Sequence, residues 1–179
     1  MRRGRCDSDP SRLGDVSRLG RINEGNGCQV PNPYSVRSIA GVHFSQPATL
    51  NCGMVAPVHD WMENTVQPAA GNAFGERVVS VDIAASYSCR PRNNKRGAKM
   101  SEHGYGNALD ISAFTLESGK KVTVLGDWGG GKDGRFLREI RGEACGQFAT
   151  VLGPGSDRHH RDHFHLDLQQ RRSGKAYCR

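Results

Sequence analysis

The sequence predicts an α+β domain in which helices pack on one side of a small antiparallel sheet. Two stretches place apolar residues at helical spacing, and other stretches alternate or concentrate branched and aromatic residues as strands do. A short turn-rich segment joins two of the expected strands, and strands joined so directly run antiparallel. The expected order is therefore helix, strand, hairpin, helix, strand.

The N-terminal part of the chain lacks this periodicity. Residues 1–44 are rich in Gly, Arg, Asn and Pro, which predicts an irregular, mostly exposed segment with Cys6 and Cys28 as candidate anchor points. A length of 179 residues suits one domain. We place the boundary so that residues 1–27 form the irregular segment and residues 28–179 form the domain.

The first helix is predicted over residues 47–66, where apolar side chains recur every three or four positions. Gly53 and Pro57 should weaken or kink this helix. Residues 72–75 should end the helical stretch, and residues 78–83 then alternate as a half-buried strand does.

The second half of the chain supplies the remaining elements. Residues 108–116 and 121–125 are expected to form a hairpin around a turn at residues 117–120. A second helix is predicted over residues 135–152, where the Gly-Pro-Gly sequence that follows should stop it. Residues 163–168 should form a short final strand.

The charge of the chain suits a polyanionic partner. There are 25 Lys and Arg residues against 18 Asp and Glu, a net charge of +7 that would favour nucleic acid, anionic lipid or an acidic cell-wall polymer. The basic clusters at residues 90–96 and 171–172 lack interleaved aromatic residues, so we expect no nucleic-acid track. No apolar run reaches the roughly 18–20 residues needed to cross a bilayer, so we expect no membrane span.

The cysteine pattern favours disulfides. The six cysteines form no Cys-x-x-Cys pair, which argues against a thiolate zinc ribbon, and an even, scattered set is typical of paired residues. Paired cysteines would indicate an oxidising compartment, periplasmic or secreted, for a chain whose export signal has been removed. The alternative is a cytosolic protein with reduced thiols. The cysteines are Cys6, Cys28, Cys52, Cys89, Cys145 and Cys178.

The last expected strand lies in a cluster of histidines and acidic residues at residues 158–167. Strand alternation places His163, His165 and Asp167 on one face. Phe164 and its alternate neighbours then share the other, apolar face, which should meet the core. Two imidazoles therefore lie side by side on a polar face.

A second cluster spans residues 101–110, where glycines permit a sharp turn that could bring His103 over Asp110. Zn²⁺ in catalytic sites takes three ligands of the His/His/Asp type and keeps a fourth position open. His103, Asp110 and one histidine of the later cluster supply such a set.

Together these clusters resemble the signature of known zinc peptidases. Ser101-x-His103-x-x-Gly106-x-Ala108-x-Asp110 followed by His163-x-His165 is similar to the motif shared by the D-Ala-D-Ala metallopeptidases, lysostaphin and the hedgehog N-domain. The chain resembles the bacterial extensin-like C-terminal domain family more closely still, over nearly its whole length. The segments that carry this second resemblance are residues 86–90, 101–103, 106–110, 144–145, 151–155 and 163–167.

The resemblance implies a D-Ala-D-Ala metallopeptidase/hedgehog-like fold and a zinc centre. By this resemblance the metal ligands are His103, Asp110 and His165, and the cofactor is Zn²⁺. Asp167 shares the ligand face, where it would either orient a ligand histidine or form a salt bridge with an arginine.

The resemblance also implies catalytic roles. His163 and His160 match active-site histidines that stabilise the transition state or move protons, and Asp162 fits the catalytic carboxylate of the carboxypeptidase branch. Arg90 matches an arginine that polarises the scissile carbonyl. Strand alternation, however, places Asp162 on the face opposite His163 unless the backbone bulges there.

We therefore expect a periplasmic or secreted zinc peptidase that hydrolyses amide bonds in peptidoglycan stem peptides or cross-links, acting as a carboxypeptidase or an endopeptidase. The alternative from another class is a non-catalytic, zinc-containing module that binds the cell wall or regulates. A zinc phosphoesterase or nuclease is a third reading, for which no second metal set is evident.

Overall fold

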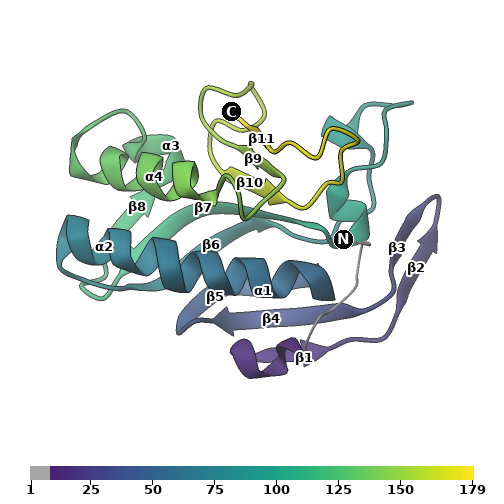
Figure 1. Cartoon of the computed structure of the whole chain (residues 1–179), viewed down its shortest axis with the longest axis horizontal. Coiled ribbons are helices and arrows are strands. Elements are labelled where there is room, and N and C mark those ends of the chain that lie inside the picture. Colours follow the sequence, from purple (N-terminus) through teal and green to yellow (C-terminus); the bar gives the residue numbers. More distant parts are fainter. Residues whose placement is uncertain (1–8) are drawn as a thin grey trace.

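The computed structural model describes residues 9–179, and in this part of the chain nine strands form one sheet (Figure 1). The strand order is β1-β4-β5-β6-β7-β10-β9-β11, and β8 pairs with β7 beside this path. A separate hairpin consists of β2 (Ile22–Gly25) and β3 (Cys28–Val30). The strands of the main sheet are β1 (Val16–Arg18), β4 (Pro33–Ile39), β5 (Val42–Asn51), β6 (Val78–Ala85), β7 (Ala108–Leu116), β8 (Lys121–Thr123), β9 (Thr150–Leu152), β10 (Phe164–Asp167) and β11 (Tyr177–Cys178).

The sheet is larger than expected. It is also mixed, because β5 pairs with β6 in parallel and β9 pairs with β11 in parallel. The other pairings in it are antiparallel. A parallel neighbour needs a long crossover connection, and the helices between β5 and β6 provide one. The prediction of a small, purely antiparallel sheet was therefore wrong.

The N-terminal strands account for much of the added size. We expected residues 1–44 to be irregular, yet β1 and β4 pair in register from Val16↔Val36 to Arg18↔Tyr34, and β4 continues into a pairing with β5. Val36 and Ile39 are fully buried in the core. The spacing of apolar residues in β1 and β4 does not show the alternation of a strand. These two strands are recognised only from their pairing with neighbouring strands. Residues 1–8, with Cys6, lie outside the described residues.

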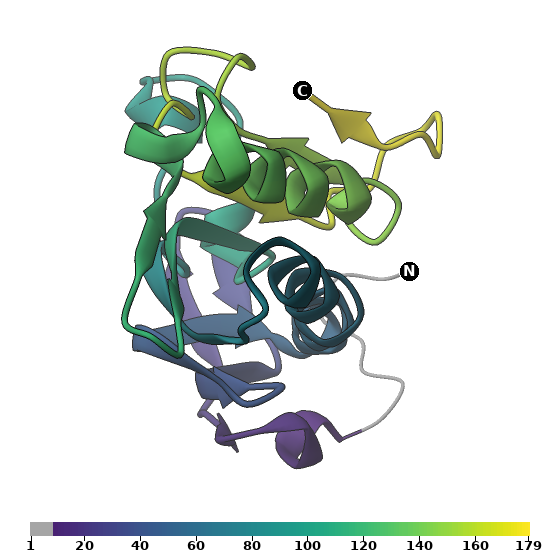
Figure 2. The ribbon, with the colours of Figure 1, turned by 90° about the vertical axis from the view of Figure 1, so that its left-hand side faces the viewer.

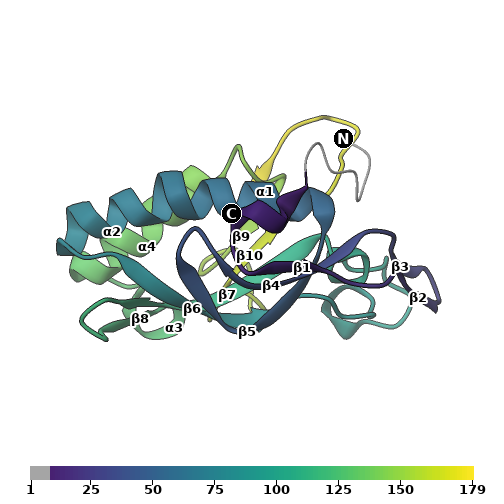
Figure 3. The ribbon, with the colours of Figure 1, turned by 90° about the horizontal axis from the view of Figure 1, so that it is seen from below.

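The three longer helices lie on one face of the sheet, as Figures 2 and 3 show. A continuous helical rod comprises α1 (Cys52–Trp61), a π-helical turn at Met62–Val66 and α2 (Gln67–Phe74). The third is α4 (Gly131–Ala144), and α3 (Val124–Asp127) is a single short turn after β8.

The first helix begins later than predicted and continues to the predicted stop. Residues 47–50 belong to β5, and the helix begins after Asn51, whose side chain accepts a hydrogen bond from the Met54 N–H as an N-cap. Pro57 lies inside α1 without ending it. Gly75, at φ 72°, ends the rod in the left-handed conformation that favours glycine, within the predicted stop at residues 72–75.

The second helix is shorter than predicted, because α4 ends at Ala144 rather than at residue 152. Cys145 is extended and bonded to Cys178, and Gly146 follows at φ 122°, a conformation that a helix does not allow. Leu152 then lies in β9, paired with His165 of β10. The predicted strand at residues 78–83, the hairpin and the final strand are confirmed by β6, β7 with β8, and β10.

The core between helices and sheet is built on aromatic side chains. Trp61 of α1 packs edge to face against Phe114 of β7 and against Phe148, and its indole N–H donates to the Ile140 carbonyl of α4. Phe164 of β10 also contacts Phe114. Each such buried side chain contributes on the order of 2–3 kcal/mol. These contacts hold β7 and β10 firmly, which matters because both strands carry candidate site residues.

The cysteines of the described residues form disulfides, as predicted. Cys28 is bonded to Cys89 and Cys145 to Cys178, and Cys52 is also disulfide-bonded. Within residues 9–179 there is no free cysteine. No helix of the described part is long and apolar enough to span a bilayer.

Candidate metal centre

Two neighbouring strands bring an aspartate and a histidine together. β7 and β10 pair antiparallel with His165 directly opposite Asp110. Alternation along β10 sends Phe164 and Leu166 into the core, where both are fully buried, and leaves His165 and Asp167 on the other face. The predicted division of faces is therefore confirmed for β10.

A tight turn brings His103 to the same point. Ser101 accepts a hydrogen bond from the His103 N–H at the start of the 3₁₀ turn Glu102–Tyr105. Gly106 follows at φ 58°, and its carbonyl accepts a 2.7 Å hydrogen bond from the Asn51 N–H. This reversal places His103 Nε2 3.1 Å from Asp110 Oδ2.

His103, Asp110 and His165 form one buried group. Each can offer a ligand atom, and these atoms all lie within 4.8 Å of one another. The side chains are only 2%, 6% and 11% exposed. The structure thus brings together all three predicted metal ligands, and the group could hold a metal ion.

Each histidine of the group has its second ring nitrogen fixed. His103 Nδ1 lies 2.5 Å from the Ser86 carbonyl, which only accepts, so Nδ1 carries the hydrogen and Nε2 faces Asp110. His165 Nδ1 lies 2.8 Å from Asp110 Oδ1, and its Nε2 lies 2.9 Å from Asp167 Oδ2. Partners of this kind orient metal-binding imidazoles.

Asp167 is itself held by a chain of hydrogen bonds. The Thr150 hydroxyl donates to Asp167 Oδ1, and the Gln169 N–H donates to the same oxygen at 2.9 Å. Behind it, the Arg171 guanidinium donates to Thr150 Oγ1 at 2.7 Å and to the Ala149 carbonyl at 2.6 Å. Asp167 forms no ion pair with an arginine within residues 9–179, so of its two predicted roles the geometry supports orienting His165.

Electrostatics favour the charged forms of Asp110 and His165. Burial alone would raise the pKa of Asp110, but hydrogen bonds from His103 and His165 outweigh it and hold the pKa well below its usual range. Burial likewise opposes the charge on His165, yet Asp110 and Asp167 together raise its pKa to about 10. Asp110 and His165 are therefore an ion pair in this structure.

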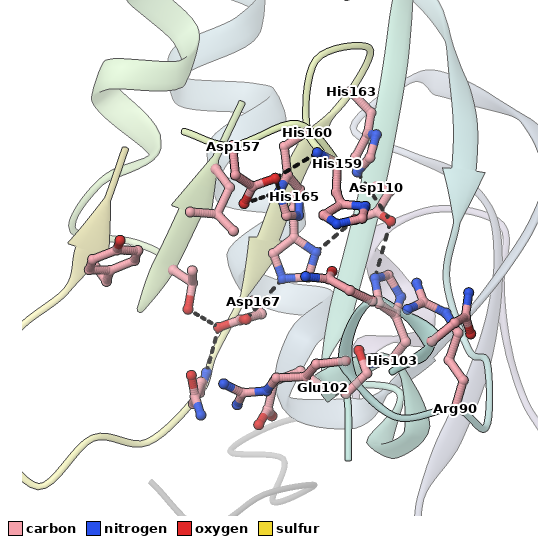
Figure 4. Close-up of a pocket in the computed structure, with 18 of the residues that line it drawn as sticks. Arg90, Glu102, His103, Asp110, Asp157, His159, His160, His163, His165 and Asp167 are labelled. Atoms are coloured by element: carbon pink, nitrogen blue, oxygen red, sulfur yellow. Dashed lines mark hydrogen bonds and ion pairs between the residues drawn. The ribbon is translucent and has the colours of Figure 1, made fainter. Parts of the chain in front are cut away.

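A second pair of histidines lies beside the group (Figure 4). His163 Nε2 is 3.6 Å from Asp110 Oδ2, and its Nδ1 is 2.8 Å from Asp162. The His160 ring lies 5.2 Å from that of His163 and 5.6 Å from that of His165, centroid to centroid.

Asp162 does not face the group formed by His103, Asp110 and His165. Its side chain is 62% exposed and contacts His163 from the far side of the ring. Asp162 precedes β10, so the strand alternation that we applied to it does not operate there. In this position Asp162 can orient the His163 ring, but it cannot contact a molecule bound next to Asp110.

The pairing of His160 with Asp157 was not predicted. Both carboxylate oxygens of Asp157 lie 2.8 and 2.9 Å from His160 Nδ1. Burial lowers the pKa of His160, while Asp157 opposes that shift. Asp157 and His160 are three positions apart in the sequence, but this spacing alone does not predict a contact. The turn that follows β9 brings the two side chains together.

A pocket of about 400 Å³ opens over these residues. Arg90 lines it on the His103 side, and Asp157 and His160 line the opposite side (Figure 4). Sequence reasoning missed several further lining residues because their contribution depends on loops that only the fold brings together. They are Arg92, Thr150, Asp157, Gln169, Arg171 and Tyr177.

The fold and the site together define a mixed α/β protein with disulfides and a buried His-Asp-His group that could bind a metal ion. A comparison with protein families matches residues 5–179 to the family described as "Extensin-like protein C-terminus". The chain belongs to this family. Comparisons with curated proteins and with solved structures found no match. The relation to the D-Ala-D-Ala metallopeptidases stays a prediction, and the disulfides are compatible with an extracellular or periplasmic location.

Proposed function

We propose that this protein is a zinc-dependent peptidase that hydrolyses amide bonds in peptidoglycan stem peptides or their cross-links. The observation that carries the proposal is the convergence of His103, Asp110 and His165 at the floor of a pocket, with their ligand atoms within 4.8 Å of one another. Additional histidines that could move protons stand beside them.

The donor set suits Zn²⁺. Two imidazole nitrogens and one carboxylate oxygen form a three-residue set of the catalytic type, and no cysteine belongs to the group. The Ser86 carbonyl and the Asp167 carboxylate support the two imidazoles from behind, as such sites require. His103, Asp110 and His165 would hold the ion, which supplies Lewis acidity that activates water and polarises a carbonyl when bound.

The proposed proton carrier is His163. Its Nε2 points toward Asp110, and Asp162 accepts from its Nδ1, so Nε2 is free to take a proton from the attacking water and return it to the leaving amine. Asp162 then stabilises the protonated ring. This assigns Asp162 to orienting the base instead of acting as the base.

Charges around the pocket assist the remaining steps. Arg90 would stabilise the negative charge that develops on the substrate carbonyl oxygen. His160, oriented by Asp157, provides a further donor on the opposite side of the pocket. The net charge of +7 suits an anionic wall polymer as the source of the substrate.

Mass spectrometry of peptidoglycan fragments incubated with the zinc-loaded protein tests this proposal. We expect a new product whose mass names the bond that is cut. The His165→Ala variant is the blank, and His43→Ala, which removes an exposed histidine of β5, is the matched control and should remain active. No product from monomeric or cross-linked fragments, with zinc bound, would favour the non-catalytic wall-binding module.

A further inference from the structure

A basic hairpin borders the candidate metal centre. This segment, Arg90–Met100, contains five Lys and Arg residues and no acidic residue. Pro91 and Met100 pair as an isolated bridge, and the Arg92 N–H donates to the Lys99 carbonyl at 2.9 Å. The segment is therefore a defined structure that presents concentrated positive charge.

The basic hairpin is fixed to the turn that carries His103. The Ser101 N–H donates to the Arg90 carbonyl at 3.1 Å, and the Ser88 N–H donates to the His103 carbonyl at 3.3 Å. The Cys28–Cys89 disulfide anchors the base of the hairpin from the other side. The backbone at the base of the hairpin is thus fixed relative to His103.

Two arginines of the hairpin line the pocket without a carboxylate partner. Arg90 and Arg92 are half-buried in the pocket wall, and neither forms an ion pair within residues 9–179. The acidic residues of the same pocket are all engaged by other groups, namely Glu102 by Asn107, Asp110 by His103 and His165, Asp157 by His160, and Asp167 by His165 and Thr150. Arg171 also lines the pocket, but its guanidinium donates to the Ala149 carbonyl, Thr150 and Gln169. Of the pocket arginines in the described residues, Arg90 and Arg92 are therefore the ones left to bind an anion.

Arginine in such a position is suited to bind a carboxylate. Its planar guanidinium offers two parallel donors to the two oxygens of a carboxylate, and partial burial reduces screening by solvent and salt. Lys95, Arg96 and Lys99 are exposed beyond the pocket, where they would attract an anionic molecule toward it.

We infer that Arg92 is a specificity-determining residue that binds a carboxylate of the peptide substrate while Arg90 attends the carbonyl. The substrate class is then a peptide that carries a free carboxylate close to the bond that is cut. This inference rests on the proposed peptidase function, since it names the substrate of the same pocket.

A double-mutant cycle on binding tests the inference. A synthetic peptidoglycan stem peptide and versions with each carboxylate amidated in turn are titrated calorimetrically into the metal-free protein, in which hydrolysis does not interfere. We expect one amidation to weaken binding to the unmodified protein about tenfold, and Arg92→Gln to weaken binding of the free peptide by a similar factor. The Arg92→Gln variant should bind the free peptide and the peptide whose amidation weakened binding to the unmodified protein with equal affinity.

Arg135→Gln is the matched control, because Arg135 is exposed on α4 and does not line the pocket. It should leave binding of all the peptides unchanged, and thermal melts should show that both variants are folded. If Arg92→Gln weakens the free peptide and every amide equally, or weakens none, the inference is wrong. Carboxylate discrimination without hydrolysis would overturn only the peptidase proposal, and hydrolysis without discrimination would overturn only this inference.

Discussion

Asp110 is the residue on which the candidate centre depends, because it contacts both histidines of the group from a buried position on β7. We expect His103→Ala and Asp110→Asn each to abolish stoichiometric zinc binding, since each removes one of three ligands. Metal analysis of the purified variants after dialysis against zinc measures this. His43→Ala should bind zinc as the unmodified protein does, and a His103→Ala variant with one tightly bound zinc would refute the ligand assignment.

Replacing His163 tests the proposed catalysis separately from metal binding. His163 contacts Asp110 only at 3.6 Å and is not a member of the ligand group. We expect His163→Ala to keep zinc and to lose peptide hydrolysis by a factor of about 10²–10⁴, the usual contribution of a general acid–base residue. Hydrolysis rates and metal content are measured on the same preparation, and unchanged turnover would move the proton-transfer role to another residue.

Thr150 acts on the centre through Asp167. Its hydroxyl donates to Asp167, which in turn holds His165. We expect Thr150→Val, which keeps the shape and removes the hydroxyl, to weaken zinc binding by about 10–100-fold. Competition with a chelator of known affinity measures the change. Thr150→Ser retains the hydroxyl and should bind zinc nearly normally; equal losses in both variants would indicate a packing effect instead.

At the scale of elements, the turn between the 3₁₀ segment and β7 has the strictest requirement. Gly106 lies at φ +58°, and a Cβ there would meet the Asn51 backbone nitrogen at 2.9 Å. We expect Gly106→Ala to lower the free energy of unfolding by about 2–3 kcal/mol, from left-handed strain plus the clash. Denaturant unfolding measures it.

Gly119→Ala provides the comparison for that variant. Gly119 also has a positive φ, +85°, but nothing lies within 4 Å of its would-be Cβ. It should lose only the conformational part, about 1–2 kcal/mol. Equal losses at the two positions would show that close approach to Asn51 contributes nothing.

The sequence predicts those elements whose pattern is local. β10 carries alternating core and polar residues, and the β7–β8 hairpin has its turn residues in place, so both were predictable. β1 and β4 have no such pattern, because they acquire their conformation by pairing with neighbours. Apolar residues at helical spacing also continued past the end of α4, where a disulfide and Gly146 impose a different path.

The candidate site divides in the same way. The three residues of the group were predictable from two short motifs, and β7 and β10 pair so that His165 faces Asp110. The Ser86 carbonyl, Thr150 and Asp157 were not, because they reach the site from loops and a neighbouring strand. Backbone carbonyls, hydroxyls and single carboxylates occur throughout a sequence, and only the fold shows which of them reach the site.

At the scale of the whole molecule, the C-terminal end is tied to the sheet. The Cys145–Cys178 disulfide closes a separation of 33 residues and holds β11 beside β9, which in turn pairs with β10. We expect the double variant Cys145→Ser/Cys178→Ser to lose about 3 kcal/mol of unfolding free energy. Urea unfolding of the two proteins under non-reducing conditions measures the difference, and an unchanged midpoint would show that the bond is dispensable.

The pairing of β7 with β10 has a kinetic consequence. Asp110 and His165 are separated by 55 positions along the chain. Their contact therefore requires the closure of a long loop, and the formation of local turns does not bring its ends together. The three residues of the group therefore cannot assemble in a chain whose hairpin and helices alone have formed. Acquisition of metal during refolding would report a late event, the joining of the C-terminal strands to the rest of the sheet, and nascent chains released before β10 is synthesised would have no high-affinity site.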